Sequence, residues 1–209
     1  MKRGLLISLL MLAVPFSRVL ALDEITKQCS SIRELVYAGW SNQFADILGD
    51  QQRSSNGRSD EPLWRFTNTR YYSDLAWPGA SSNFIEDYNE ETDSMRMRNW
   101  QFIAEMGAVP DLLEAQRLLR RLNEEIEGCP FLQNDSLRSE FRPLPPDSLP
   151  STCPAELQLA SLYELPLQDS SANMQHQLSI MTGIEKDKQL YRVNLVVEDR
   201  RIYSNIRRK

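Results

Sequence analysis

Apolar residues recur every three or four positions over residues 23–48, which is the spacing of one face of a helix. Gly49 would end this helix, because glycine tolerates the left-handed conformation that often follows a helix. Residues 50–62 are polar and almost free of apolar side chains, so we predict an exposed loop there. The apolar face consists of Ile25, Cys29, Ile32, Val36, Trp40, Phe44 and Ile47.

A second amphipathic helix is predicted to begin after Pro110. Asp111 and Glu114 have the spacing of a capping box at its start, and Gly128 and Pro130 would stop it. The face opposite the apolar stripe is charged, so only one side of this helix should be buried. The stripe consists of Leu112, Ala115, Leu119, Leu122 and Ile126.

The segment between the two helices has the pattern of strands. Aromatic and threonine residues at spacing two predict strands over residues 63–77, and Pro78 followed by Gly79 predicts a type II turn into a strand at residues 83–88. Residues 95–98 alternate strictly, and the alternation breaks at Trp100. This break predicts a strand with a bulge or with two buried faces.

The last third of the chain predicts a meander of further strands. Alternation recurs over residues 157–165, 174–180 and 191–197, and residues 201–206 would form a short final strand. Residues 142–154 contain five prolines and are predicted to form a stiff connector. Runs of strands with two main helices predict an α+β fold with an antiparallel sheet, in a single domain over residues 22–209.

The first 21 residues have the features of a removable export signal. Lys2 and Arg3 precede an apolar run over residues 5–14, and small residues before Leu22 provide a cleavage site. The apolar run is shorter than the roughly 20 residues that span a bilayer, so no transmembrane segment is expected. We therefore expect a soluble chain that is secreted or periplasmic.

Removal of this signal makes the chain more acidic. The signal contains Lys2, Arg3 and Arg18, so 21 basic side chains remain against 29 acidic ones, a net charge of -8. This balance argues against nucleic-acid binding, which requires a basic surface. The remaining apolar residues are numerous enough for a hydrophobic core.

Three cysteines are expected in an oxidising compartment, and an odd number leaves one unpaired. Cys129 and Cys153 are each followed by proline and would close the shortest loop, so this pair is preferred among three pairings. Cys29 would then be left over, either as a buried thiol or as the link in a disulfide-linked dimer. The buried thiol is favoured, because Cys29 belongs to the apolar helix face.

Catalytic chemistry is restricted by the single histidine of the chain. His176 alternates with Met174 and Leu178, which predicts a buried position on a strand rather than a catalytic base. One histidine cannot form a polyhistidine metal site, and the chain has neither a dinucleotide fingerprint nor a phosphate-binding loop. We expect no catalytic residue, metal or cofactor.

One acidic stretch resembles the first half of a calcium-binding loop, because Asp87, Asn89, Glu91 and Asp93 alternate. The twelfth position of such a loop is Arg98, where a bidentate glutamate is required. A solvated acidic loop between strands is therefore the preferred interpretation.

Nine of the 17 aromatic residues that follow the signal lie between Trp64 and Phe102. Aromatic side chains fill the cores of antiparallel sheets, and this is the more common reason for such a cluster. They also provide binding surfaces with a polar tip. The candidate binding residues are Tyr72, Trp77, Tyr88, Glu90 and Glu91.

The leading hypothesis is an exported, non-catalytic protein that binds another macromolecule, either a protein or a glycan. The alternative is a secreted hydrolase of a polysaccharide or cell-wall polymer, because paired carboxyl groups are the one catalytic chemistry that the composition allows. Its candidate acids are Glu86, Asp87, Glu90 and Glu91. A group of basic residues near the C-terminus is interpreted as charges that protect an edge strand, with contact to anionic lipid or an acidic partner as the alternative. The group consists of Arg200, Arg201, Arg207, Arg208 and Lys209.

Overall fold

The computed structural model describes residues 26–59, 64–130, 132, 142–143, 158–164, 174–187 and 189–204. The predicted export signal, Cys153 and most of the proline-rich connector lie outside the described residues.

The N-terminal helix covers residues 26–42 and ends earlier than periodicity predicts. Gln43 and Phe44 have positive φ angles of 59° and 63°, and the Phe44 N–H donates to the carbonyl of Ala38 at 3.0 Å. The Phe44 ring folds back onto Gly39, where an added Cβ atom would lie 2.8 Å from the ring. Phe44 is fully buried, so it keeps its predicted place in the core without extending the helix.

The predicted loop at residues 50–62 is wrong, because most of it belongs to strand β1 (Leu48–Ser59). A short 3-10 helix, η1 (Ala45–Ile47), precedes this strand. Strand β1 is at one edge of the sheet and pairs only with β2 (Trp64–Ser73) among the described strands. Residues 51–56 are all exposed. An edge strand exposed on both faces needs no apolar alternation, which is why its sequence resembles a loop.

The predicted type II turn is confirmed. Gly79 has a φ of 82°, and the Ala80 N–H donates to the Trp77 carbonyl at 3.1 Å. Strand β3 (Ser82–Glu91) follows and includes most of the acidic stretch that was predicted to be a loop. Strand β4 (Met95–Val109) is bulged after Glu105. At the predicted break in alternation, the consecutive residues Asn99 and Trp100 are both buried, one on each face of the sheet.

Helix α2 (Leu112–Glu127) confirms the second predicted helix. The Leu113 N–H donates to the Asp111 side chain at 3.0 Å, so Asp111 is the N-terminal cap. The predicted stripe is buried at Ala115, Leu119, Leu122 and Ile126.

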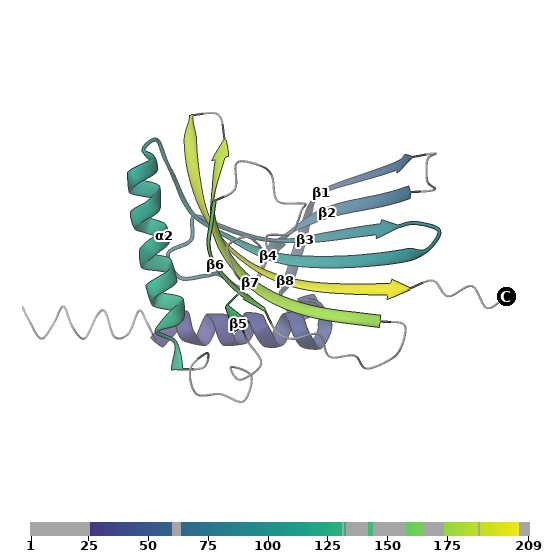
Figure 1. Ribbon diagram of the computed structural model, residues 1–209, viewed down its shortest axis with the longest axis horizontal. Helices are drawn as coiled ribbons and strands as arrows, with labels where there is room; N and C mark the ends of the chain where they lie inside the picture. Colours follow the sequence, from purple (N-terminus) through teal and green to yellow (C-terminus); the bar gives the residue numbers. More distant parts are fainter. Residues whose placement is uncertain are drawn as a thin grey trace, which may run out of the picture.

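The C-terminal strands complete one antiparallel sheet in the order β1-β2-β3-β4-β8-β7-β6-β5. Two meanders are thus joined through the central pair of β4 and β8, and Figure 1 shows the helices on the same side of the bent sheet. The predicted α+β class is confirmed. These strands are β5 (Arg142–Pro143), β6 (Gln158–Glu164), β7 (Met174–Asp187) and β8 (Leu190–Ser204).

Strand β8 corrects the interpretation of the C-terminal arginines. It continues through both of the last two predicted strands and pairs with β4 on one side and β7 on the other. Arg200 and Arg201 therefore lie on a central strand, so they do not protect an edge.

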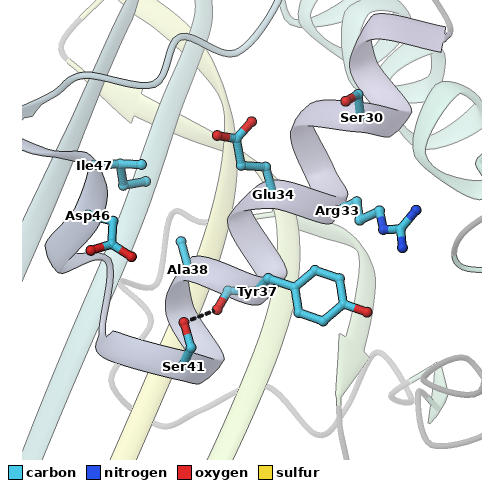
Figure 2. Close-up of a pocket in the computed structure, with 8 residues that line it drawn as sticks. All are labelled: Ser30, Arg33, Glu34, Tyr37, Ala38, Ser41, Asp46 and Ile47. Atoms are coloured by element: carbon cyan, nitrogen blue, oxygen red, sulfur yellow. Dashed lines mark hydrogen bonds between the residues drawn. The ribbon is translucent and has the colours of Figure 1, made fainter.

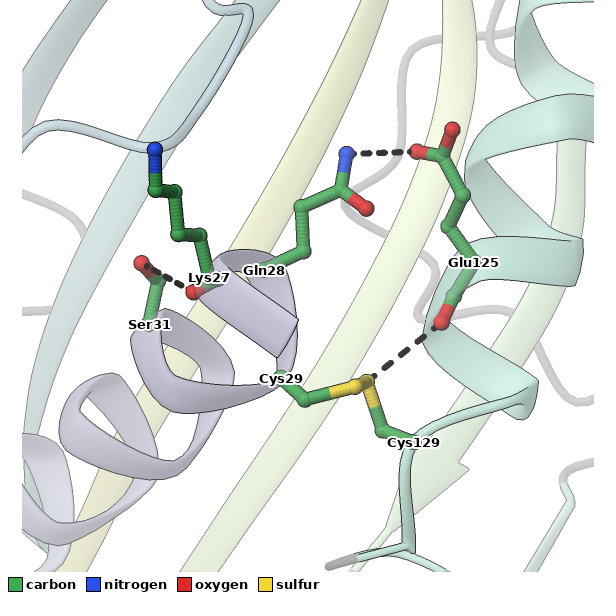
Figure 3. Close-up of a disulfide and its surroundings, with 6 residues drawn as sticks. All are labelled: Lys27, Gln28, Cys29, Ser31, Glu125 and Cys129. Atoms are coloured by element: carbon green, nitrogen blue, oxygen red, sulfur yellow. Dashed lines mark hydrogen bonds between the residues drawn. A yellow bond between two sulfur atoms is a disulfide. The ribbon is translucent and has the colours of Figure 1, made fainter. Parts of the chain in front are cut away.

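The predicted disulfide is also corrected, because Cys29 is bonded to Cys129. Figure 3 shows the bond between the N-terminal helix and the chain just after α2, with the Gln28 amide donating to the Glu125 carboxylate nearby at 2.8 Å. The two Cα atoms lie 5.2 Å apart. Packing of both helices on one sheet brings these distant residues together, whereas the sequence favoured the shorter loop. Cys29 is therefore not the free buried thiol that was favoured, and it is not available for the alternative interchain bond.

Candidate functional site

The two faces of the sheet have different surroundings. Ile85, Phe102 and Val197 stand opposite one another on β3, β4 and β8, and they share one hydrophobic core with residues of both helices. Phe84 and Met181 project to the other face and are buried outside this core. Neither of the helices that the structure describes packs on this second face. We call it the helix-free face.

A row of polar side chains crosses the helix-free face. One residue comes from each of five neighbouring strands, and each stands opposite the next in the register of the sheet. With strands about 4.8 Å apart, the row is about 19 Å long. We call it the polar row; its members are Asn68, Tyr88, Asn99, Arg200 and Gln177.

A second row lies beside it, two residues along each strand. Its centre is Glu198, which is 2% exposed. The Glu198 carboxylate accepts hydrogen bonds from Asn99 at 2.6 Å, Gln101 at 2.9 Å and Arg200 at 3.1 Å. Glu198 therefore orients two members of the polar row. This supporting row consists of Arg70, Glu86, Gln101, Glu198 and Ser179.

At the other end of the supporting row, Glu86 is held by arginines. Arg70 donates to its carboxylate through Nε at 2.6 Å, and Arg53 donates at 3.3 Å. The Arg70 guanidinium also lies 3.9 Å from the centre of the Phe84 ring. The Glu86 carboxylate therefore holds two arginine side chains at this end of the row.

Three buried polar atoms of the polar row have no hydrogen-bond partner among the described residues: Asn68 Oδ1, Asn99 Oδ1 and Arg200 Nε. Asn99 is 6% exposed. A buried polar group without a partner costs about 1–3 kcal/mol. Most buried polar groups in proteins are paired, so three unpaired atoms in one row require an explanation.

Tyr88 lies between Asn68 and Asn99 in the polar row. Burial, together with the nearby Glu90 carboxylate, raises the pKa of Tyr88 above its ordinary value of 10.0. Its hydroxyl therefore stays protonated at neutral pH and can donate a hydrogen bond.

The structure brings some of the predicted binding residues together. Tyr72, Tyr88 and Glu90 all project to the helix-free face, and Tyr72 is 55% exposed. Glu91 projects to the opposite face. Trp77 was a candidate binding residue, but it is 1% exposed in the loop before β3, where it belongs to the core.

The candidate acids of the hydrolase alternative do not converge. Glu86 and Asp87 are consecutive on β3 and project to opposite faces. Glu86 and Glu90 share a face but lie four residues apart, about 13 Å along a strand. Glycosidases place their carboxyl groups roughly 5–9.5 Å apart. Burial raises the pKa of Asp87 despite the opposing Arg98, but its partners in the register of the sheet are Thr69 and Trp100, and neither carries a carboxyl group.

The stretch that resembles a calcium loop is a strand. Asp87, Asn89 and Glu91 lie along one face of β3, so their oxygens spread along the strand instead of surrounding one point. Arg98 donates to the Asn89 side-chain oxygen at 3.0 Å. Within the described part of the chain, no group of three or more His, Cys, Asp or Glu side chains could hold a metal ion.

His176 is buried on β7, as its alternation predicts, at 8% exposure. Its ring hydrogen-bonds to Asp199, which is fully buried, and stacks on Trp40 with 4.2 Å between ring centres. Arg201 donates to Asp199 at 3.1 Å and to the Trp40 carbonyl at 3.3 Å. The histidine thus fastens the end of the N-terminal helix to β7 and β8, which sequence reasoning did not anticipate.

A hollow on the N-terminal helix is a weaker candidate site. It has a volume of about 400 Å³, and Figure 2 shows the side chains that line it, including Glu34 and Asp46. Ser41, on its wall, donates to the Tyr37 carbonyl at 2.6 Å, and Asn42 donates to Asp46. Two of its polar side chains, Ser41 and Asp46, therefore already have hydrogen-bond partners within the chain.

No family model, curated protein or solved structure matches the chain. Within the residues that the structure describes, no helix is both long and apolar enough to cross a membrane. The assignment of a function therefore depends on the geometry of the helix-free face.

Sequence reasoning missed Asn68, Asn99, Gln101 and Glu198 as site residues. Part of the signal was present, because Gln175, Gln177 and Ser179 alternate with the apolar residues of β7. Alternation shows that such residues share a face of one strand. It does not show which residues of other strands stand beside them.

Proposed function

We propose that this protein is exported, acts in the periplasm or outside the cell, and binds another macromolecule on the helix-free face of its sheet without catalysing a reaction. The observation that supports this proposal is the polar row with its three unpaired buried atoms. Proteins retain such groups at a stability cost chiefly where function requires them.

The surrounding residues favour binding over hydrolysis. The helix-free face combines exposed Tyr72 with paired arginines and carboxylates, a mixture of aromatic and polar groups typical of recognition surfaces. Glu86 is neutralised by arginines, and its neighbour Asp87 faces the other side of the sheet. The candidate acids on β3 therefore do not form the close pair of carboxyl groups that the hydrolase mechanism needs.

Site-specific photocrosslinking in the source cell tests this proposal. The photoreactive residue p-benzoylphenylalanine would replace Tyr72, which is 55% exposed on the helix-free face. The matched control places the same residue at Leu113, which is 62% exposed on α2. We expect a discrete adduct from position 72 and none from position 113.

Two outcomes would contradict the proposal. One is the absence of any adduct at position 72 in an exported, folded chain. The other is an equal yield of the same adducts from both positions, which would indicate non-specific collision. Fractionation of the source cell also tests export, because a full-length chain retained in the cytoplasm would exclude the proposed location.

A further inference from the structure

The unpaired atoms of the polar row indicate the chemistry of its ligand. We propose that the polar row binds hydroxyl groups of an uncharged glycan, with a sugar ring stacked on Tyr88. This inference rests on the proposed function, because it names the class of macromolecule that the helix-free face would bind.

The first step of the argument is the adjacency of an unpaired acceptor and an unpaired donor. Asn99 and Arg200 stand directly opposite each other on β4 and β8. Cβ atoms at such positions lie about 4.5–5.5 Å apart. Asn99 Oδ1 can only accept a hydrogen bond, and Arg200 Nε can only donate one. A hydroxyl group satisfies both at once, because it has one donor hydrogen and two acceptor lone pairs.

Charged ligands fit this pair less well. A phosphate or carboxylate would accept from Arg200 Nε but would face the lone pairs of Asn99 Oδ1. An ammonium group would donate to Asn99 but would face the Arg200 guanidinium. The Glu198 carboxylate already receives three hydrogen bonds, so it leaves little unbalanced charge to attract a cation. The pair therefore favours an uncharged group.

The rest of the row suits repeated hydroxyl groups. Asn68 Oδ1 is a second unpaired acceptor, on the other side of Tyr88 from Asn99. The aromatic ring of Tyr88 offers an apolar surface, and its protonated hydroxyl offers a donor. A sugar chain presents both apolar ring faces and hydroxyl groups, which matches an acceptor, an aromatic ring, an acceptor and a donor in series.

The site is partly prearranged. Glu198 holds the Asn99 amide and the Arg200 guanidinium in place before any ligand arrives, and this reduces the entropy lost on binding. The unpaired atoms are buried, so a partly exposed neighbour such as Tyr88 or Gln177 must turn before a hydroxyl reaches them. Exposed side chains change rotamer within picoseconds to nanoseconds, so this movement does not prevent access.

The test uses the oxidised, exported chain and a panel of uncharged oligosaccharides, namely cello-, chito-, malto- and xylo-oligosaccharides, with oligogalacturonate as the anionic comparison. Calorimetry measures affinity. Nitrogen-edited NMR of arginine side chains follows the Arg200 Nε–H resonance. We expect at least one uncharged oligosaccharide to bind and to shift the Arg200 resonance, while the resonance of Arg117, which is exposed on α2, stays in place.

Four variants, one of them a control, test individual residues. Arg200→Lys removes the Nε donor but keeps a cation for Glu198, so affinity should fall about tenfold with little change in melting temperature. Arg117→Lys, at an exposed position on α2, is the matched control and should bind as the wild type does. Tyr88→Ala should abolish measurable binding by removing the ring, and Tyr88→Phe should largely restore it because the stacking surface returns.

The outcomes separate this inference from the proposed function. If no oligosaccharide binds but position 72 still captures a protein, the glycan is excluded and the binding function remains. If neither experiment gives a signal, both proposals fail. A preference for oligogalacturonate would exclude the uncharged hydroxyl ligand. A bound oligosaccharide that leaves the Arg200 resonance unchanged would contradict the inference. It would show that the unpaired atoms do not contact the sugar and are hydrogen-bonded to buried water instead.

Discussion

The disulfide between Cys29 and Cys129 allows a quantitative test of the fold, because its two residues are 100 positions apart. In the chain-entropy model, a crosslink that closes a loop of about 100 residues stabilises the folded chain by about 4.7 kcal/mol. The pairing that the sequence favoured, Cys129 with Cys153, closes a loop of roughly 24 residues and would contribute about 3.5 kcal/mol in the same model.

The perturbation is the double variant Cys29→Ala/Cys129→Ala, which removes the bond without leaving a thiol that could pair with Cys153. For a chain of this size, each kcal/mol shifts the melting temperature by roughly 2–4 °C. A loss of about 4.7 kcal/mol therefore predicts a decrease of about 9–19 °C. Cys153→Ala is the control and should leave the melting temperature close to that of the wild type.

The assay is thermal unfolding followed by circular dichroism on chains purified from an oxidising compartment. Peptide mapping without reductant should recover Cys29 linked to Cys129, and non-reducing gels should show a monomer. Equal melting temperatures for the wild type and the double variant would refute the loop-entropy argument. A peptide joining Cys129 to Cys153, or a dimer that reductant dissolves, would refute the pairing itself.

Three further predictions concern single side chains. Trp77→Ala should lower the free energy of unfolding by about 3–5 kcal/mol, because Trp77 is buried in the core, and Tyr72→Ala should change it by less than about 0.5 kcal/mol, both measured by urea denaturation. Asp111→Ala should cost about 1 kcal/mol in the same assay, because it removes the cap of α2. Burial raises the pKa of Asp87, so the folded chain binds this proton more tightly than the unfolded chain does, and the wild type gains stability from it as the pH falls below neutrality. Asp87→Asn should therefore be more stable than the wild type at neutral pH. This advantage should shrink as the pH falls toward the ordinary carboxyl range.

Each of these predictions has a distinct contrary result. Comparable losses in Trp77→Ala and Tyr72→Ala would place both side chains in the core and weaken the assignment of the helix-free face. An unchanged unfolding midpoint in Asp111→Ala would mean that water replaces the cap at no cost. A stability difference for Asp87→Asn that grows as the pH falls would show that neighbouring arginines outweigh burial at Asp87.

Rules that concern only neighbouring residues were sufficient to predict the turn at Pro78 and Gly79 and the helix α2. The Pro78 and Gly79 dihedral preferences act within four residues, and the Asp111 cap acts within the first turn of its helix. The burial of His176 likewise followed from alternation along a single strand. In each case the deciding interaction lies close by in the sequence, so pattern alone could predict it.

Only the tertiary structure decided the helix end and the disulfide. Phe44 fits the helical periodicity, yet its ring packs back on Gly39 and the helix stops before it. Cys29 meets Cys129 because both helices pack on the same face of the sheet, and this proximity has no counterpart in sequence spacing.

The sequence determined that this protein combines two helices with an antiparallel sheet, because hydrophobic periodicity and turn chemistry are local properties of a chain. The candidate site could not be predicted in this way, because it depends on how distant strands pair. Asn99 becomes a neighbour of Arg200 only through the register of β4 on β8. A shift of that register by one residue would turn every side chain of the strand to the other face. The chemistry of the helix-free face is therefore decided by non-local pairing.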